Sequence, residues 1–400
     1  MLQENFEQQQ FKQRLETLVV FRALLRDEVL HSFLKLLRHW QGPKAAWHYG
    51  AFAAALYRSG GDFGRHLMEK VLEDENPAVR AAVAGALPAV LQQTMNSELS
   101  LFTALAAINP AGFAAQAGQG QPLPLWENTP ADFAAEYNRR LGQLATKGYG
   151  VFAAFHMFTL GEGAQLKPVK NPDPQRLAGL TGYGRERGQV DTNTKALLKG
   201  LPANNILLYG DAGTGKSSTV KALANEYYGQ GLRLVEVRKN QLYQIPLLMD
   251  SLAENPLKFI VFIDDLSFSS DDGGFTELKA MLEGSISARP RNIVVYATSN
   301  RRHMVQERFS TRQGDDLHLN DTLEEESSLA ARFGLTITFL KPDRDLYAEI
   351  VKTLATEYGL KTPLPELLRL AEAHALRHGG RSPRTARQFV EYRKALEETQ

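Results

Sequence analysis

Hydrophobic positions in the first part of the chain recur at helical spacing. Between residues 11 and 40 they follow one another at steps of three to five residues, which places most of them on one face of a helix (Phe11, Leu15, Leu18, Phe21, Leu25, Leu30, Phe33, Leu37 and Trp40). Similar patterns cover Trp47–Tyr57, His66–Leu72 and Ala131–Leu144. We therefore predict an all-α N-terminal domain over residues 1–165, for which the sequence names no chemistry.

The pattern then changes to strands that alternate with helices. Short apolar runs typical of buried strands occupy five segments (Asn205–Tyr209, Leu232–Val237, Phe259–Ile263, Ile293–Thr298 and Leu335–Phe339). Helical patterns lie among them (Lys216–Tyr228, Leu247–Leu252 and Glu277–Leu282). This alternation predicts an α/β fold, a parallel sheet with helices on both faces, over residues 166–340. We interpret the Gly- and Pro-rich segment Gly161–Pro174 as the connection to it.

Three helical patterns with no strand between them follow the α/β region. They cover Asp343–Tyr358, Leu364–His378 and Pro383–Glu398. We predict that they form a small C-terminal helical lid over residues 341–400. The expected architecture is therefore an all-α domain, an α/β core and a lid.

Composition and charge remove several classes of function. Among 400 residues, Lys+Arg 46 and Asp+Glu 45 leave a net charge of +1, which excludes a chain-wide basic field for nucleic acid. The absence of Cys excludes disulfides, thiolate nucleophiles and metal sites held by Cys. The polar start, Met1–Gln10, lacks the pattern of a signal peptide, and the weakly charged stretch Ala81–Trp126 is interrupted by proline and polar residues. We expect a cytoplasmic protein without a membrane span.

One loop carries a complete phosphate-binding pattern. The run is Gly210-Asp211-Ala212-Gly213-Thr214-Gly215-Lys216-Ser217, followed by Ser218. Glycines let successive backbone N–H groups point at a triphosphate, and the helix that begins near Gly215 adds its positive end. Lys216 is expected to meet the β and γ phosphates, and Ser217 to bind Mg²⁺. Because the loop follows a predicted strand and opens a helix, a plain glycine-rich turn is disfavoured, and we predict ATP and Mg²⁺ as cofactors.

A second apolar strand ends in two carboxylates. Phe259–Ile263 is followed by Asp264 and Asp265, and ligands of parallel sheets bind at the carboxyl ends of the strands. Asp264 is predicted to hold Mg²⁺, and Asp265 to polarise the attacking water as general base. An Asp-rich turn is the alternative, which the nearby phosphate loop disfavours.

The order of these motifs, followed by Ile293–Asn300, resembles the AAA+ ATPase family of P-loop proteins over roughly Leu177–Phe389. The resemblance implies that a strand between the two motif strands ends in a polar sensor, Asn300, which orients the lytic water. Many members have Asp-Glu where this chain has Asp-Asp, a pair that also occurs in the initiator and helicase-loader branch. Three segments further resemble an uncharacterised bacterial AAA+ family with an N-terminal helical region and one ATPase core (Ile263–Phe268, Ala297–His303 and His378–Ser382).

Three more site residues rest on the same resemblance. Arg332, in Ser328–Leu335, matches an arginine finger presented to a neighbouring subunit; the alternative is an ion pair with Glu324–Glu326. Arg384 matches the second sensor at the start of a lid helix. Its rivals are Arg381 and Arg387, and the alternative is a solvated basic helix start. Tyr183, in Leu180–Gly184, matches a segment that lines the adenine pocket, unless this is a glycine-rich turn.

These features lead to one functional hypothesis and two alternatives. The family implies that ATP turnover drives motion of a polymer through or around a ring, and we expect remodelling of an unknown protein or complex. A finger acting in trans predicts a homo-oligomer, expected to be a hexamer. An initiator-like or loader-like ATP switch on nucleic acid is the first alternative, disfavoured because the basic groups lack interleaved aromatic residues. A nucleotide-binding scaffold with little turnover is the second.

Overall fold

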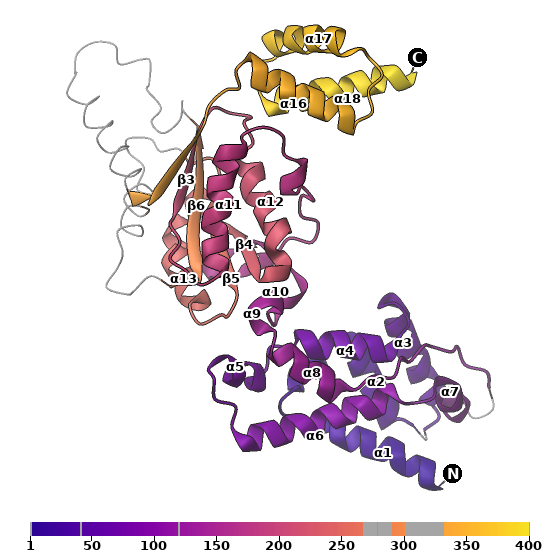
Figure 1. Cartoon of the computed structure of the whole chain (residues 1–400). Helices are drawn as coiled ribbons and strands as arrows, with labels where there is room; N and C mark the ends of the chain where they lie inside the picture. Colours follow the sequence, from indigo (N-terminus) through magenta and orange to yellow (C-terminus); the bar gives the residue numbers. More distant parts are fainter. Residues whose placement is uncertain are drawn as a thin grey trace. The chain divides into compact units, whose positions relative to one another are not determined.

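The computed structural model describes residues 2–40, 42–118, 121–266, 278, 290–300 and 332–399. Contacts divide the chain into two units, Met1–Ala154 and Phe155–Gln400, which Figure 1 traces in indigo to magenta and in magenta to yellow. The predicted helix Glu277–Leu282 lies outside the described residues, apart from Leu278.

The first unit is all-α, with ten helices and one 3-10 turn among its described residues. They are α1 (Leu2–Glu16), η1 (Arg22–Arg26), α2 (Glu28–Arg38), α3 (Ala45–Arg58), α4 (Phe63–Glu73), α5 (Pro77–Val83), α6 (Ala89–Ala106), α7 (Pro110–Gly118), α8 (Phe133–Leu141), α9 (Leu144–Lys147) and α10 (Val151–Ala154). No single helix in the described part of the chain is long and apolar enough to cross a bilayer; only α6 and α7 taken together, bent by 79°, meet the length and composition required.

The continuous helix predicted between residues 11 and 40 is two helices with a turn between them. The Glu98 side chain accepts hydrogen bonds from the backbone N–H groups of Val19, Val20 and Phe21, which diverts this backbone from helical bonding. Asp27 then caps α2 by accepting from the N–H groups of the helix start. The helical spacing was present in the sequence, but a carboxylate from α6 interrupts the helix.

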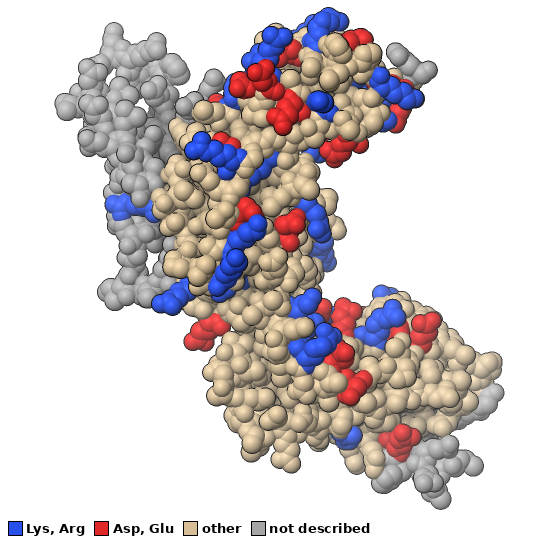
Figure 2. Space-filling model, viewed as in Figure 1, with Lys and Arg blue, Asp and Glu red and all other residues tan. Residues whose placement is uncertain are grey.

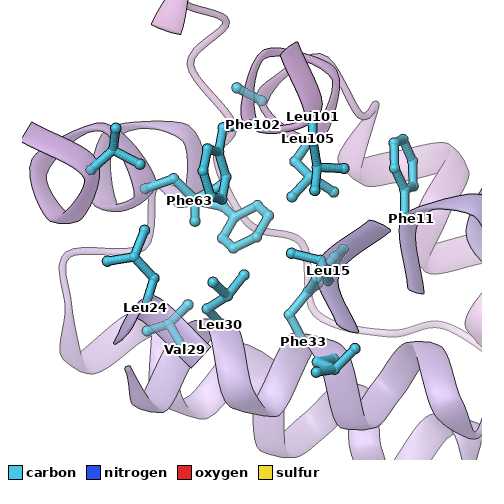
Figure 3. Close-up of a cluster of buried hydrophobic side chains, with 14 of the residues drawn as sticks. Phe11, Leu15, Leu24, Val29, Leu30, Phe33, Phe63, Leu101, Phe102 and Leu105 are labelled. Atoms are coloured by element: carbon cyan, nitrogen blue, oxygen red, sulfur yellow. The ribbon is translucent and has the colours of Figure 1, made fainter. Parts of the chain in front are cut away.

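Aromatic side chains form much of the core of this unit. The ring of Phe33 lies 5.1 Å from that of Phe52, 4.8 Å from that of Phe63 and 5.6 Å from that of Phe113, measured between centroids. Figure 3 shows part of this cluster, with side chains of α1, α2, α4 and α6 pointing toward one another. Burial of these apolar faces is the main force that holds the helices together.

The second unit contains a seven-stranded sheet in the order β2-β1-β4-β5-β6-β3-β7. The strands are β1 (Met157–Leu160), β2 (Leu166–Pro168), β3 (Ile206–Gly210), β4 (Leu232–Glu236), β5 (Lys258–Ile263), β6 (Ile293–Asn300) and β7 (Leu335–Phe339). All neighbours are parallel except β1 and β2. The helices here are η2 (Glu162–Ala164), η3 (Leu177–Gly179), α11 (Gly184–Leu198), α12 (Lys216–Tyr227), η4 (Tyr228–Gln230), η5 (Lys239–Gln244) and α13 (Ile245–Leu252). The predicted α/β fold class is confirmed.

Strands β1 and β2 correct the predicted connection and domain boundary. β1 pairs in parallel with β4, and β2 pairs with β1. The second unit therefore starts at Phe155, before the boundary predicted between residues 165 and 166. These short strands form because β1 can pair with the edge of β4. No local periodicity in the sequence predicts such a partner.

The sheet topology brings the ends of the motif strands together. β6 lies between β3 and β5, and the registers pair Gly210 with Asn300 and Ile263 with Ala297. Because parallel strands end at the same edge of a sheet, the phosphate loop, Asp264 and Asn300 all emerge there.

Three helices, α16 (Arg344–Glu357), α17 (Leu364–Arg377) and α18 (Pro383–Thr399), follow the sheet as predicted. They bury a hydrophobic cluster of their own, to which Tyr347, Leu367 and Phe389 each contribute from a different helix. This lid belongs to the same unit as the sheet.

Candidate functional site

The carboxyl edge of the sheet borders a cavity of about 680 Å³. Its wall comes from segments distant in sequence: the stretch before α11, the phosphate loop, the ends of β5 and β6, and the lid. The predicted site residues that line it are Ala212, Gly213, Gly215, Lys216, Ser217, Ser218, Asp264, Asp265, Asn300 and Arg384. The predicted residues Gly210, Asp211, Thr214, Tyr183 and Arg332 do not line it.

The path of the phosphate loop depends on glycine. Gly210, Gly213 and Gly215 have φ angles of 135°, 78° and 92°, a region that other residues rarely adopt. A Cβ atom on Gly210 would also lie 2.1 Å from the carbonyl oxygen of Phe339 on β7. The loop therefore turns tightly against β7 and presents the start of α12 to the cavity.

Three predicted loop residues support this turn from behind the cavity wall. The Thr214 hydroxyl donates to the carbonyl oxygen of Asp211 at 2.9 Å. The Asp211 carboxylate in turn accepts from the backbone N–H of Lys341, where the lid begins. Gly210 contributes the close approach to β7. These contacts shape the loop, and none of these three residues lines the cavity.

The Lys216 ammonium group has three acceptors. Nζ donates to the carbonyl oxygens of Gly210 and Asp211 at 3.0 and 2.7 Å, and to Oδ1 of Asn300 at 2.9 Å. Burial lowers the pKa of Lys216 from its ordinary value, and the nearby carboxylates oppose that shift. All three N–H groups are engaged, so any further acceptor would have to replace one of these three.

Ser217 and Asp264 meet at the end of β5. The Ser217 hydroxyl donates to Oδ1 of Asp264 at 2.6 Å, and the Thr298 hydroxyl donates to the same oxygen at 2.6 Å. A hydroxyl and a carboxylate side by side are the oxygen ligands that Mg²⁺ prefers. The donor set fits that cation, and Thr298 orients the carboxylate from behind.

Asp265 is held by two residues of β6. Its backbone N–H donates to the Thr298 hydroxyl at 2.9 Å, and its Oδ1 accepts from Nδ2 of Asn300 at 2.7 Å. Asp265 has a φ of 54°, an uncommon left-handed conformation for this residue type. Asn300 therefore links Lys216 on one side to Asp265 on the other.

The three candidate arginines of the lid are separated by their surroundings. Arg381 forms an ion pair with Glu372, with its Nε 3.0 Å from both carboxylate oxygens, and this hydrogen bonding lowers the pKa of Glu372. Arg384 and Arg387 line the cavity instead. The backbone N–H of Arg384 also donates to the carbonyl oxygen of Gly213 at 3.3 Å, which joins the start of α18 to the phosphate loop.

Tyr183 does not occupy the place predicted for it. Its side chain is buried, its hydroxyl donates to the carbonyl oxygen of Leu340 at 2.6 Å, and burial raises its pKa. Its φ of 54° at the start of α11 directs the ring into the core of the unit. The residues of this segment that line the cavity are Leu180 and Thr181.

Arg332 lies at the opposite edge of the sheet from the phosphate loop. It precedes β7, whose first residue, Leu335, pairs with Ile206, while its last, Phe339, pairs with Gly210. Ser328–Ala331 of the predicted finger segment lie outside the described residues, as do Glu324–Glu326 and Arg301–His303.

Thr298 and Arg187 are among the residues of the cavity wall that sequence reasoning missed. The sequence could have indicated Thr298, because it lies two positions before Asn300 and alternate residues of a strand share a face. No such pattern indicated Arg187, on α11. Its Nη1 donates to the carbonyl oxygens of Leu180 and Gly182, both at 2.5 Å, a contact created by the turn before the helix.

The fold and this arrangement define the class of the protein. A phosphate loop after β3, an acidic end of β5, an intervening strand that ends in Asn300 and a helical lid make it a member of the AAA+ ATPase superfamily, with an N-terminal helical region. Residues 152–396 match the family described as "Protein of unknown function (DUF815)", and the chain belongs to that family.

Comparisons with individual proteins cover less of the chain. A replication factor C large subunit from Staphylothermus marinus is 31% identical over 121 residues, which is 28% of this chain and 28% of that protein. A structure of the RuvB Holliday junction branch migration motor from Thermotoga maritima is 15% identical, with a TM-score of 0.36 over 55% of this chain and 63% of that one. A variant of it gives 0.37 at 16% identity.

Proposed function

We propose that this chain binds ATP with Mg²⁺ in the cavity and hydrolyses it. The observation that carries the proposal is the chain of contacts from Lys216 through Asn300 to Asp265, beside the pair Ser217 and Asp264. Phosphoryl transfer depends on a cation at the phosphates, a metal-ligand pair and a group that positions water. The three groups lie at or beside the ends of neighbouring strands, in the wall of one cavity.

The contacts suggest how nucleotide binding changes the site. A γ-phosphate oxygen that takes one proton of Lys216 displaces one of its three acceptors. Asn300 is the acceptor that contributes a side-chain oxygen, whereas the other two are carbonyl oxygens of the loop. Releasing Asn300 therefore disturbs the loop backbone least. Oδ1 of Asn300 is then available to orient a water molecule toward Asp265, the proposed general base. When bound, Mg²⁺ neutralises charge on the phosphate oxygens, and Ser217 and Asp264 would hold it.

We further propose that turnover occurs in a ring of identical chains, with a hexamer as the expected size. Arg332 is too far from the phosphate loop of its own chain, at the other edge of the sheet, and is suited to act on a neighbour's nucleotide. Arg384, from the lid, is the proposed second sensor. Its position ties the lid to the nucleotide, because the lid backbone already contacts Gly213.

The expected outcome of turnover is remodelling of a protein or complex, with the N-terminal helical unit as adaptor. On the face shown in Figure 2, basic and acidic side chains are interspersed over both units and form no single basic field. A switch that acts on nucleic acid is the second candidate, favoured by the similarity to a replication factor C subunit. ATP-dependent DNA binding that weakens steeply with salt would favour this second candidate.

The decisive test of catalysis compares ATP hydrolysis by the wild type and by Asp265→Asn. We expect the substitution to lower kcat by about 100-fold to 10,000-fold, since it removes a general base, while ATP affinity is retained. Asp250→Asn, on the exposed face of α13, is the matched control and should leave kcat unchanged. A wild type that binds ATP without measurable turnover would instead identify a nucleotide-binding scaffold.

The role of Arg332 is tested by mixing two inactive variants, Arg332→Ala and Lys216→Ala. In a mixed ring, a functional phosphate loop from the first variant can face a functional arginine from the second. We therefore expect part of the hydrolysis rate to return on mixing. No recovery, although mixed assemblies form, would show that Arg332 does not act on a neighbouring site.

A further inference from the structure

Arg187 is a buried cation without an anionic partner among the described residues. Its side chain is only 8% exposed, yet no carboxylate in the described part of the chain lies within ion-pair distance of it. Nη1 donates to two carbonyl oxygens, and Nε has no acceptor among the described residues. Burial lowers the pKa of Arg187 to about 10, which records the cost of holding this charge away from water. Buried charges of this kind are normally paired, so the site lacks an anion.

The guanidinium lies between two parts of the cavity wall. Through Nη1 it holds the turn of Leu180 and Gly182, and through Nη2 it approaches the phosphate loop. A Cβ atom on Gly215 would lie 3.4 Å from Nη2. Among the described residues no acceptor meets Nη2, and Arg187 lines the cavity. A guanidinium with a free N–H edge facing a cavity is suited to a phosphate oxygen.

We propose that Arg187 binds the α-phosphate of the nucleotide, an inference that rests on the proposed ATP site. The α-phosphate joins the nucleoside to the rest of the phosphate chain. Arg187 correspondingly joins the turn of Leu180 and Gly182 to the loop at Gly215. Lys216 instead donates to Asn300 and to the carbonyl oxygens of Gly210 and Asp211, and we assign it to the β and γ phosphates.

This role makes two predictions that a purely structural arginine does not make. Nucleoside mono-, di- and triphosphates all carry an α-phosphate, so Arg187 should contribute to the affinity of each. Adenosine has no α-phosphate, so its affinity should not depend on the charge at position 187. Support of the turn at Leu180 and Gly182 alone would instead affect adenosine and the nucleotides equally.

The experiment measures dissociation constants of adenosine, AMP and ADP by calorimetry for the wild type, Arg187→Gln and Arg187→Lys. We expect Arg187→Gln to weaken the binding of AMP and ADP by about 10-fold to 100-fold, the range for a lost hydrogen bond to a charged group. Adenosine should change less than about threefold, and Arg187→Lys should recover part of the loss. The control, Arg185→Gln, removes the same charge from an exposed position on α11 and should leave all three unchanged. An equal loss for adenosine, or no loss for ADP, overturns the proposal.

A second measurement applies if adenosine and AMP bind too weakly. The two diastereomers of ADP that carry sulfur on the α-phosphate are compared with ADP itself. Arg187 should make the wild type discriminate against one diastereomer, and Arg187→Gln should remove that discrimination. Equal discrimination in both proteins contradicts the contact. Unfolding temperatures without nucleotide show whether each variant is folded.

The outcomes also separate this inference from the proposed function. If the wild type does not bind ADP, the ATP site itself fails. If the wild type binds ADP and Lys216→Ala removes that binding, while Arg187→Gln leaves it unchanged, only the role of Arg187 fails.

Discussion

The buried carboxylates of the N-terminal unit and the cations at the cavity of the C-terminal unit have different surroundings. In the N-terminal unit, the Glu98 carboxylate accepts from three backbone N–H groups, and Asp62 accepts from the N–H groups of Arg65 and Thr129 and from the Thr129 hydroxyl. In the C-terminal unit, Lys216 and Arg187 face a cavity, and Arg187 has no anionic partner among the described residues.

This difference separates structural charges from binding charges. Burial costs free energy in both units, and a charge remains ionised only where hydrogen bonds or an opposite charge replace water. Where the protein supplies all partners, as around Glu98, the group fixes the backbone. Where N–H groups remain open toward a cavity, as on Arg187, we expect a ligand to complete the set. Substitutions in the first unit should therefore change stability, and those at the cavity should change binding.

The largest expected effect is that of Lys216→Ala on nucleotide affinity. Truncating one partner of a buried charge contact costs about 3 kcal/mol, so ADP and ATP should bind about 100-fold more weakly or not at all. Calorimetry measures the affinity, and hydrogen exchange in α2 and α6 should be unchanged. Retained affinity would overturn the assignment of the phosphate loop.

Glu98→Ala should have its effect on stability in the other unit. Three buried N–H groups lose a charged acceptor, which should destabilise the turn before α2 by roughly 3 kcal/mol. Faster hydrogen exchange around Val19–Phe21, with unchanged ADP affinity, is the expected result. The control Glu136→Ala removes only an exposed ion pair with Arg139 and should cost less than about 1 kcal/mol. A loss of ADP affinity in Glu98→Ala would contradict the separation of the units' roles.

A pair of glycine substitutions tests the same separation through packing. A Cβ atom on Gly64 would lie 2.2 Å from the carbonyl oxygen of Thr129, and one on Gly210 would lie 2.1 Å from that of Phe339. We expect Gly64→Ala and Gly210→Ala each to destabilise its own unit by about 2 kcal/mol. Only Gly210→Ala should also weaken ADP binding, measured by calorimetry. Equal ADP affinity in both variants would show that the loop tolerates the displacement.

The smallest effect concerns pH and Asp27. Burial raises the pKa of Asp27, but the hydrogen bonds from His66 and from the N–H of Leu30 more than offset this and leave it below its ordinary value. The stabilisation by this carboxylate is complete above the unfolded pKa of about 3.9 and is lost as the pH falls through the lowered folded value. Asn also caps helices well, so Asp27→Asn should lower the free energy of unfolding by only on the order of 1 kcal/mol at pH 7. Hydrogen exchange of α2 at pH 7 and in acid measures the difference, which should vanish in acid.

The elements that the sequence predicted well are those with their own periodic pattern. The three lid helices and the five predicted strands agree with the structure within a few residues. β1 was missed because Met157–Leu160 becomes a strand through its pairing with β4. The break before α2 was missed because its cause, Glu98, lies on α6. In both cases the partner is distant in sequence, and no local pattern reports it.

The sequence by itself determined the phosphate loop, the acidic end of β5 and the fold class, because each depends on residues close together in the chain or on a repeated alternation. Only the tertiary structure decided which lid arginines line the cavity, since the ion pair with Glu372 holds Arg381 away. It also placed Tyr183 in the core and Arg187 at the cavity. The physical reason is that burial and charge pairing act only between groups that are close in space. Folding brings these groups together from segments that are distant in sequence.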